Sequence, residues 1–296
     1  LVAAGQGAHA AKHRDAESTT ASTPLQLLAD IMHGGNSSPA SFPQLATTFP
    51  VLHILPFYPW DTDRGFSVKD YRKVDPRNGT WDDVARFAAG NTELMFDFVA
   101  NHASVDNPLI QNALLQRHVT QEMSAAVFDR IQPFRDFVIA YDDRNRPSDD
   151  TLAQLARPRP NPVLTRYFVV HDGEDSFRAL LGTPAADLLS SGDNENTIVI
   201  GSGWCWTTFS RGVDPATGRE NTRQIDLNFS NWRVLVEVVR ILIEYVARGC
   251  RIVRLDAVGY IWKSLGRPSI HEENAHRLIK VMRECMRSVS SKTIMI

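Results

Sequence analysis

Two charged side chains interrupt an apolar segment, RIVRLDAVGYIW, which runs from Arg251 to Trp262. Apolar runs of this kind are typical of buried strands, where a charge costs free energy unless it is paired or used in a reaction. Because side chains alternate between the two faces of a strand, Arg254 and Asp256 are expected to point to the same side. They also stand at the C-terminal end of the strand, where parallel α/β proteins carry their active sites.

A carboxylate beside a guanidinium group stays ionised, because the positive charge lowers its pKa by about 1–3 units. An ionised Asp256 therefore suits a nucleophile or a group that stabilises positive charge, and it does not suit a proton donor. The alternative is an ion pair with Arg254 that only braces the strand. This segment by itself leaves both interpretations open.

The segment ELMFDFVANH, from Glu93 to His102, repeats the pattern of a strand that ends in polar residues. Asp97, Val99 and Asn101 share one face, and His102 follows them. A histidine with ordinary hydrogen-bond partners and an asparagine in a turn would explain these residues without any function. A metal site is another interpretation, but the spacing matches no compact zinc pattern.

The loop PFYPWDTDRGFSVKDY follows a predicted strand at residues 51–57. Its first charged residues are Asp61, Asp63 and Arg64. The aromatic residues among them are Phe57, Tyr58, Trp60 and Phe66. Aromatic platforms beside carboxylates favour sugars, whose C–H faces stack on rings and whose hydroxyls donate hydrogen bonds. A polar loop over a hydrophobic lid is the alternative.

Strand and helix patterns alternate around these three clusters. Strands are expected at 51–57, 93–102, 251–256 and 292–296, and helices at 23–32, 80–90, 230–249 and 270–289. In the second helix Thr80 is the expected N-cap, Asp83 takes the capping-box position and Gly90 ends the helix. This alternation predicts an α/β fold with a parallel sheet.

The middle of the chain, residues 103–229, is expected to be a long irregular insertion. A helix should end near FRDFVIAYDD, and the prolines of RPRPNPVL forbid both a helix and a central strand. From there to about Gln224 the chain is rich in Gly, Asp, Asn, Ser and Thr. The whole of 24–296 is expected to form one domain that includes this insertion, after a disordered or cropped start at 1–23.

Bulk composition narrows the classes of partner and compartment. The 296 residues are 43% hydrophobic and 22% charged, as in ordinary globular proteins, and the net charge of −2 gives no support for nucleic acid or an anionic membrane as partner. No apolar stretch approaches the roughly 18 residues of a membrane span. Three widely spaced cysteines and a start that is unlike a secretory signal favour a reduced, cytoplasmic protein.

The three clusters, each just after a strand and in this order, resemble the α-amylase-type glycoside hydrolase superfamily. DFVANH resembles its first signature region and RIVRLDAVGYIW its second. The segments ILPFYPWDTDRGFSVKDY, RPRPNPVLTRYF, WTTFS, QIDLNF and RLDAVGYIWKSLG resemble the branch that contains sucrose, sucrose 6'-phosphate and glucosylglycerate phosphorylases. The likeness covers about residues 52–296 and is poor through the middle loops.

This resemblance implies a (β/α)8 TIM barrel and an enzyme of carbohydrate metabolism, a glycosyltransferase that moves glucose from an α-glucoside to inorganic phosphate with retention. Asp256 would be the nucleophile, and Arg254 would hold it ionised and oriented. Asp63 and His102 would bind hydroxyls of the glucosyl ring, and Phe66 would line its pocket. Phosphate would be a co-substrate, with no metal or other cofactor. A glycoside hydrolase or transglucosidase on the same scaffold, or a non-catalytic sugar-binding relative, is the alternative.

Two departures from the family pattern are visible. A retaining enzyme needs a second carboxyl as acid/base, and the family places it just after the strand that KTIMI resembles, where this sequence stops. The first strand of the family also has no match in this sequence. The chain is therefore expected to hold about the second to the fifth strand of a barrel and to be a fragment with little activity alone. Its gene is expected to continue with a glutamate within about five residues. The second departure is RGVDPATGREN, which separates WTTFS from QIDLNF where the family joins them closely. By analogy this segment lies on the acceptor side of the site, so the identity of the acceptor stays open.

Overall fold

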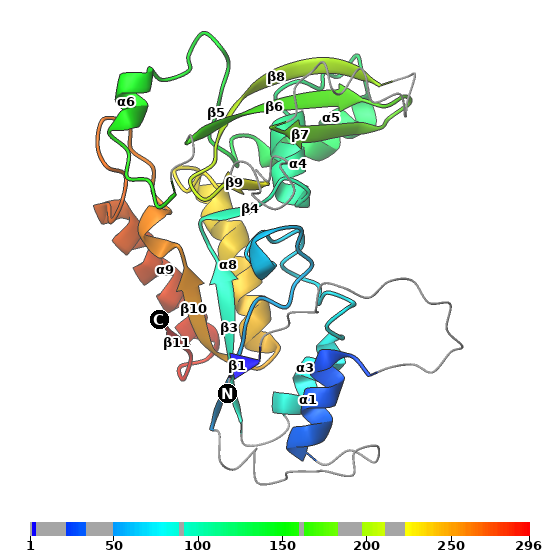
Figure 1. The fold of residues 1–296 in the computed structure, drawn as a ribbon, viewed down its shortest axis with the longest axis vertical. Helices are drawn as coiled ribbons and strands as arrows, with labels where there is room; N and C mark the ends of the chain where they lie inside the picture. The colour runs from blue at the N-terminus through cyan, green and yellow to red at the C-terminus, as the bar shows by residue number, and fades with distance from the viewer. Residues whose placement is uncertain are drawn as a thin grey trace.

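Five parallel strands form the main sheet of the computed structural model, which describes residues 2–3, 22–33, 50–88, 92–159, 163–182, 197–210 and 223–296. The strand order is β1 (Val2–Ala3), β2 (Val51–Ile54), β3 (Glu93–Val99), β10 (Cys250–Asp256) and β11 (Ile294–Met295). The helices that alternate with them are α1 (Pro24–His33), α3 (Trp81–Ala88), α8 (Trp232–Ala247) and α9 (Glu273–Val289). The predicted α/β fold with a parallel sheet is confirmed (Figure 1).

One strand of this sheet lies where none was predicted. Val2–Ala3 fall in the stretch expected to be disordered or cropped, yet they form β1 and pair in parallel with β2. The described part of the barrel therefore has one more strand than the predicted second to fifth. A strand of two residues carries no readable alternation of apolar and polar side chains, so the pattern of the sequence could not show it. Residues 4–21 lie outside the described residues.

Local capping signals set where the helices begin. At α3 the Thr80 amide donates to Asp83 Oδ2 at 2.8 Å, and the Asp83 amide donates back to Thr80 Oγ1 at 3.3 Å. This is the predicted capping box, which satisfies two amides that a helix start leaves unpaired. At α8 the Asn231 side chain accepts from the Arg233 amide at 3.0 Å. The predicted stop at Gly90 lies outside the described residues.

The prediction of an irregular insertion is wrong. Residues 103–229 contain an antiparallel sheet in the order β5 (Ala140–Tyr141), β8 (Ile198–Trp206), β6 (Leu164–His171) and β7 (Phe177–Leu181), with helices α4 (Pro108–Leu115), α5 (Ala125–Ile131) and α6 (Asp149–Ala153). The strand β6, LTRYFVVH, is rich in the β-branched and aromatic residues that favour strands. The frequent turn residues between the strands masked this preference.

The helix predicted to end near FRDFVIAYDD ends earlier. It stops at Ile131, and a short 3-10 turn, η2 (Gln132–Phe134), follows before β5 begins. Pro133 explains the break, because proline removes a backbone donor and clashes with the preceding turn of an α-helix. The insertion then returns to the barrel through β4 (His102–Ser104) and β9 (Gln224–Asp226), which pair antiparallel between the two sheets (Figure 1). The segment RGVDPATGREN lies outside the described residues.

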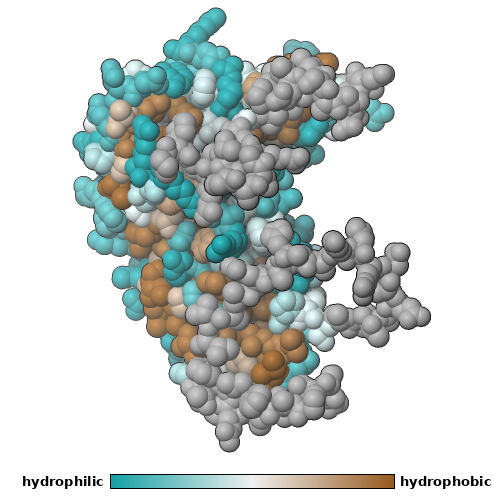
Figure 2. All heavy atoms as spheres, in the orientation of Figure 1, coloured by the Kyte–Doolittle hydropathy of each residue, from teal (hydrophilic) through white to brown (hydrophobic). Residues whose placement is uncertain are grey.

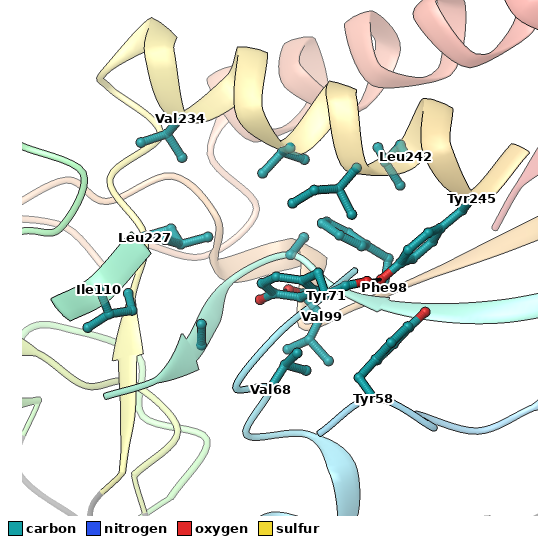
Figure 3. Close-up of a cluster of buried hydrophobic side chains, with 14 of the residues drawn as sticks. Tyr58, Val68, Tyr71, Phe98, Val99, Ile110, Leu227, Val234, Leu242 and Tyr245 are labelled. Atoms are coloured by element: carbon teal, nitrogen blue, oxygen red, sulfur yellow. Dashed lines mark hydrogen bonds between the residues drawn. The ribbon is translucent and has the colours of Figure 1, made fainter. Parts of the chain in front are cut away.

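A cluster of buried tyrosines joins α8 to the parallel sheet. Tyr245 of α8 stacks on Tyr58 with the ring planes 10° apart and the ring centres 5.4 Å apart (Figure 3). The Tyr245 hydroxyl donates to the Tyr71 carbonyl at 2.7 Å, and the Tyr58 hydroxyl donates to the Asp97 carbonyl at 3.1 Å. Each ring therefore buries apolar area while its hydroxyl keeps a partner. The cluster holds the backbone of β3 against the helix.

Exposed apolar side chains lie at one edge of the parallel sheet. Figure 2 shows hydrophobic atoms among polar ones in both the upper and the lower part of the visible face. Ile294 and Ile296, at the β11 edge of the described sheet, are 47% and 60% exposed. None of the helices among the described residues combines the length and the apolar character needed to cross a membrane.

Substitution of Tyr245 should separate ring packing from hydrogen bonding. Tyr245→Phe keeps the ring but leaves a buried carbonyl without its donor, which should cost about 1–3 kcal/mol of unfolding free energy. Tyr245→Ala also removes the ring and should cost about 3–5 kcal/mol, as for other buried aromatic residues. Urea unfolding of the full-length protein measures both, with the exposed Val281→Ala as the control. Equal losses for Phe and Ala would show that the ring packing contributes nothing.

Acid should weaken the insertion through His118. The Tyr167 hydroxyl and His118 Nε2 lie 2.9 Å apart, and burial, helped by the charge of Arg117, lowers the pKa of His118 from 6.5 to about 4. The unfolded chain therefore binds this proton at a higher pH than the folded chain, so stability is complete above about pH 6.5 and falls as the pH drops towards 4. His118→Gln should reduce this loss in thermal melts from pH 7 to pH 4.5, and the exposed His276→Gln should not.

Candidate active site

One guanidinium group joins two carboxylates from neighbouring strands. In the parallel pairing of β3 with β10, Arg254 lies opposite Asp97 and Asp256 lies opposite Val99. Arg254 Nη1 donates to Asp97 Oδ1, and it also lies 3.2 Å from Asp256 Oδ1. Burial lowers the pKa of Arg254, but the bond to Asp97 and the two negative charges outweigh this and raise it. We call Asp97, Arg254 and Asp256 the ion triad.

A histidine from a third strand is the second hydrogen-bond partner of the Asp97 side chain. The Asp97 side chain is 0% exposed, so an unpaired carboxylate there would cost several kcal/mol. His53 of β2 meets it from the other side, with Nε2 2.7 Å from Asp97 Oδ2. The sequence pattern drew attention to Asp97 but not to His53, which looks like one polar residue in a short strand. Only the side-by-side order of β2, β3 and β10 reveals the contact.

The loop after β2 carries Asp63 in a strained turn. Asp63 and Arg64 adopt φ angles of 58° and 53°, a region that side chains other than glycine rarely occupy. Asp63 Oδ2 accepts from Arg159 Nη2 at 2.8 Å and from Gln224 Nε2 at 3.1 Å. Both donors belong to the insertion, so this predicted sugar-binding carboxylate is held by a distant part of the chain. Arg159 lies in the proline-rich segment, where the sequence indicated only a helix breaker.

His102 is buried at the centre of the predicted site. Its Nε2 donates to the Phe66 carbonyl at 3.2 Å, and the Asn101 side-chain amide lies 3.2 Å from its Nδ1. These partners match a neutral imidazole with the proton on Nε2. The ring centre of Phe209 lies 5.1 Å from that of His102, and Tyr260 meets Phe209 edge-on at 5.1 Å. The structure thus adds two aromatic side chains that the sequence did not single out.

The electrostatics of His102 tie the predicted residues into one site. Burial lowers the pKa of His102, and the negative charges of Asp226, Asp256 and Asp63 offset only part of this effect. The imidazole is therefore neutral near pH 7 while carboxylates surround it. All five residues singled out by the sequence, Asp63, Phe66, His102, Arg254 and Asp256, lie at the carboxyl end of the parallel strands or in the loops beside it.

This arrangement offers a carboxylate held by a guanidinium, a neutral imidazole and aromatic rings. Such a set suits a polyhydroxylated ligand that is attacked by a carboxylate. The three residues for which a metal site was considered have other partners: Asp97 binds Arg254, Asn101 binds Lys263, and His102 binds the Phe66 carbonyl. Among the described residues, no group of three or more His, Cys, Asp or Glu is placed to hold a metal ion.

Comparison with known sequences finds homologues among sugar phosphorylases, although no family model matches the chain. A glucosylglycerate phosphorylase of Allomeiothermus silvanus is 33% identical over 273 residues, which are 92% of this chain and 37% of that protein. One of Escherichia coli is 35% identical over 85% of this chain and 34% of that protein. A sucrose 6(F)-phosphate phosphorylase of Thermoanaerobacterium thermosaccharolyticum is 28% identical over 74% and 36%. The chain spans about a third of the length of these relatives.

Solved structures share the fold. A sucrose 6F-phosphate phosphorylase from Thermoanaerobacter thermosaccharolyticum matches 92% of this chain and 44% of its own, with a TM-score of 0.64 and 21% identity. An isomaltulose synthase from Klebsiella sp. LX3 matches 85% of this chain and 38% of its own, with a TM-score of 0.54 and 19% identity. The predicted partial barrel and the resemblance to the sucrose phosphorylase branch are thereby confirmed over the part that this chain covers.

Proposed function

We propose that the protein transfers an α-glucosyl group from an α-glucoside to inorganic phosphate, with retention, and releases α-glucose 1-phosphate. The observation that carries this proposal is the ion triad, which holds the side chain of Asp256 beside the Arg254 guanidinium at the carboxyl edge of the parallel sheet. The homologues named as phosphorylases indicate which reaction this carboxylate serves.

The chemistry follows from the roles of the residues in a double displacement. An oxygen of Asp256 attacks the anomeric carbon, the bond to the leaving oxygen breaks, and a glucosyl ester forms on the enzyme. A second carboxyl protonates the leaving oxygen and then takes a proton from the incoming phosphate, which breaks the ester. Arg254 orients the Asp256 side chain through its hydrogen bond at 3.2 Å. The two inversions give one retention, and inorganic phosphate is the co-substrate that takes the glucosyl group.

Binding of the glucosyl ring is assigned to Asp63, Phe66 and His102. A carboxylate accepts hydrogen bonds from sugar hydroxyls, and the Nε2–H of His102, which donates to the Phe66 carbonyl in the structure, would turn to a sugar hydroxyl when the ring binds. Burial lowers the pKa of His102, so its neutral form persists at physiological pH. Phe66 packs against the core beside them and supplies an apolar surface for the C–H face of the ring.

The donor is proposed to be an α-glucoside with an acidic leaving group. Two relatives more than 30% identical are named glucosylglycerate phosphorylases, whereas the sucrose 6(F)-phosphate phosphorylase is 28% identical. Glucosylglycerate is therefore the first donor to test, before sucrose 6'-phosphate and sucrose. A cytoplasmic location agrees with the free thiols of Cys205, Cys250 and Cys285.

A second candidate is transglucosylation or hydrolysis on the same scaffold. The fold likeness to an isomaltulose synthase favours it, because the same barrel carries a different reaction there. The two candidates share the attack by Asp256 and differ only in the group that breaks the glucosyl ester. Phosphate dependence therefore separates them.

Phosphate should be required for turnover of the full-length gene product. Glucosylglycerate, sucrose 6'-phosphate and sucrose would each be offered with and without inorganic phosphate, and the products followed by proton and phosphorus NMR. We expect α-glucose 1-phosphate only when phosphate is present, with glucosylglycerate consumed fastest. Release of glucose at the same rate without phosphate would show a hydrolase instead.

Asp256→Asn should abolish transfer without unfolding the protein. The amide keeps the shape of the side chain but cannot form the glucosyl ester, so kcat should fall about 10³-fold or more. The control is Asp129→Asn on the exposed face of α5, which should keep full activity. Thermal melts check that both variants are folded. Activity of Asp256→Asn within tenfold of the wild type would exclude Asp256 as the nucleophile.

A further inference from the structure

Lys263 places a cation inside a cage of three oxygens beside the candidate active site. Its side chain is only 5% exposed. The ammonium lies 2.6 Å from Asn101 Oδ1 and 2.8 Å from Asp226 Oδ2, and it also donates to the backbone carbonyl of Tyr260. An ammonium has three donors and no acceptor, so each of its N–H groups meets one oxygen.

The three oxygens come from three separate segments of the chain. Asn101 follows β3, Asp226 ends β9 of the insertion, and Tyr260 ends the short turn η3 (Val258–Tyr260) that comes after Asp256. Lys263 itself lies beyond η3. Its ammonium therefore connects the carboxyl ends of two barrel strands with the strand that brings the insertion back.

A chain of hydrogen bonds runs from this ammonium to His102. Lys263 donates to the Asn101 side-chain oxygen, which turns the Asn101 amide nitrogen towards His102 Nδ1, at 3.2 Å. His102 is left with its proton on Nε2, where it donates to the Phe66 carbonyl at 3.2 Å. The Lys263 ammonium thus fixes which way the Asn101 side-chain amide is oriented. The Asn101 amide in turn fixes the tautomer of His102 that carries its proton on Nε2.

The same cage also holds His102 from the opposite side. Asp226 is the residue paired with His102 in the β4–β9 ladder. The Tyr260 ring rests edge-on against Phe209, and Phe209 contacts the His102 ring. Asn101 and Asp226 are therefore direct neighbours of His102, and Tyr260 is connected to it through Phe209.

Stability alone is a weak reason for a buried ion pair. Taking two charges out of water costs about as much as their attraction returns, and apolar side chains often replace such pairs without loss. Burial lowers the pKa of Lys263, and the charge of Asp226 opposes this effect. A buried amino group whose nitrogen meets three oxygens from separate segments points to a role in geometry.

We infer that Lys263 is a positioning residue, whose ammonium fixes the Asn101–His102 turn, η3 and β9 relative to one another and so sets the orientation of His102 beside Asp256. The inference rests on the proposed function, because it supposes that His102 binds the glucosyl ring during transfer. Lys263 itself contacts no substrate in this scheme.

Chemical rescue tests the role of the cation in the full-length gene product. Lys263→Ala removes the ammonium and three carbons, which together match n-propylammonium. A displacement of about 1 Å at a site costs about 100-fold in rate, so kcat/KM for phosphorolysis should fall on that order, mostly through kcat. Added n-propylammonium should restore at least tenfold, and neutral n-propanol nothing. Lys263→Arg should not retain the wild-type activity, because a guanidinium group is larger and planar and does not fit a site in which three oxygens surround an ammonium.

A variant that lacks both charges of the Lys263–Asp226 pair separates a loss of activity from a loss of folding. Lys263→Met alone leaves Asp226 as a buried, unpaired carboxylate, whereas Lys263→Met with Asp226→Asn removes both charges. The double variant should fold, lose kcat as Lys263→Ala does, and show faster hydrogen exchange in β4 and β9 with no change in α8. The exposed Lys280→Met on α9 is the control and should match the wild type in every measurement.

The outcomes keep the two proposals apart. If the wild type turns over no donor, the proposed function fails, and hydrogen exchange still decides whether Lys263 orders β4 and β9. If the wild type is active and Lys263→Ala keeps its activity within twofold, the positioning role is overturned. A loss of activity in Lys263→Ala that n-propylammonium does not reverse, together with unchanged exchange in the double variant, also overturns it.

Discussion

Pairing of a guanidinium group between two carboxylates is the constraint on which the rest of the structure depends. Asp97 is fully buried, so its charge requires partners, and Arg254 reaches it only because β3 and β10 pair with these two residues opposite one another. A slip of β10 by one residue in this register would turn Arg254 to the other face of the sheet and part it from Asp97. The stacked tyrosines that hold β3 against α8 keep that register, and with it the position of Asp256.

The insertion is part of the same site and not an appendage to the barrel. Arg159 and Gln224 hold the carboxylate of Asp63, and β9 pairs with β4 at His102. The groups assigned to the sugar are therefore shared between two sheets whose strands run in different arrangements. Strained backbone at Asp63 and Arg64 persists because these long-range contacts hold it.

Local signals predicted most of the elements correctly. The Thr80–Asp83 capping box and the apolar periodicities define helices within a few residues of their observed bounds. Prediction failed where the signal was short or mixed. The two residues of β1 have no period, and the strands of the insertion lie between so many turn residues that their β-branched character was overlooked.

The sequence by itself determined the α/β class, the place of Arg254 and Asp256 on one strand face, and the resemblance that assigns them a reaction. These follow from residue type and spacing along a few turns or strands. Only the tertiary structure decided that Arg254 and His53 are the partners of Asp97, and that Lys263 reaches Asn101 and Asp226. Such partners lie from 37 to more than 150 residues apart along the chain, so local sequence patterns cannot show them. Strand register and loop closure bring them together, and neither leaves a periodic trace in the sequence.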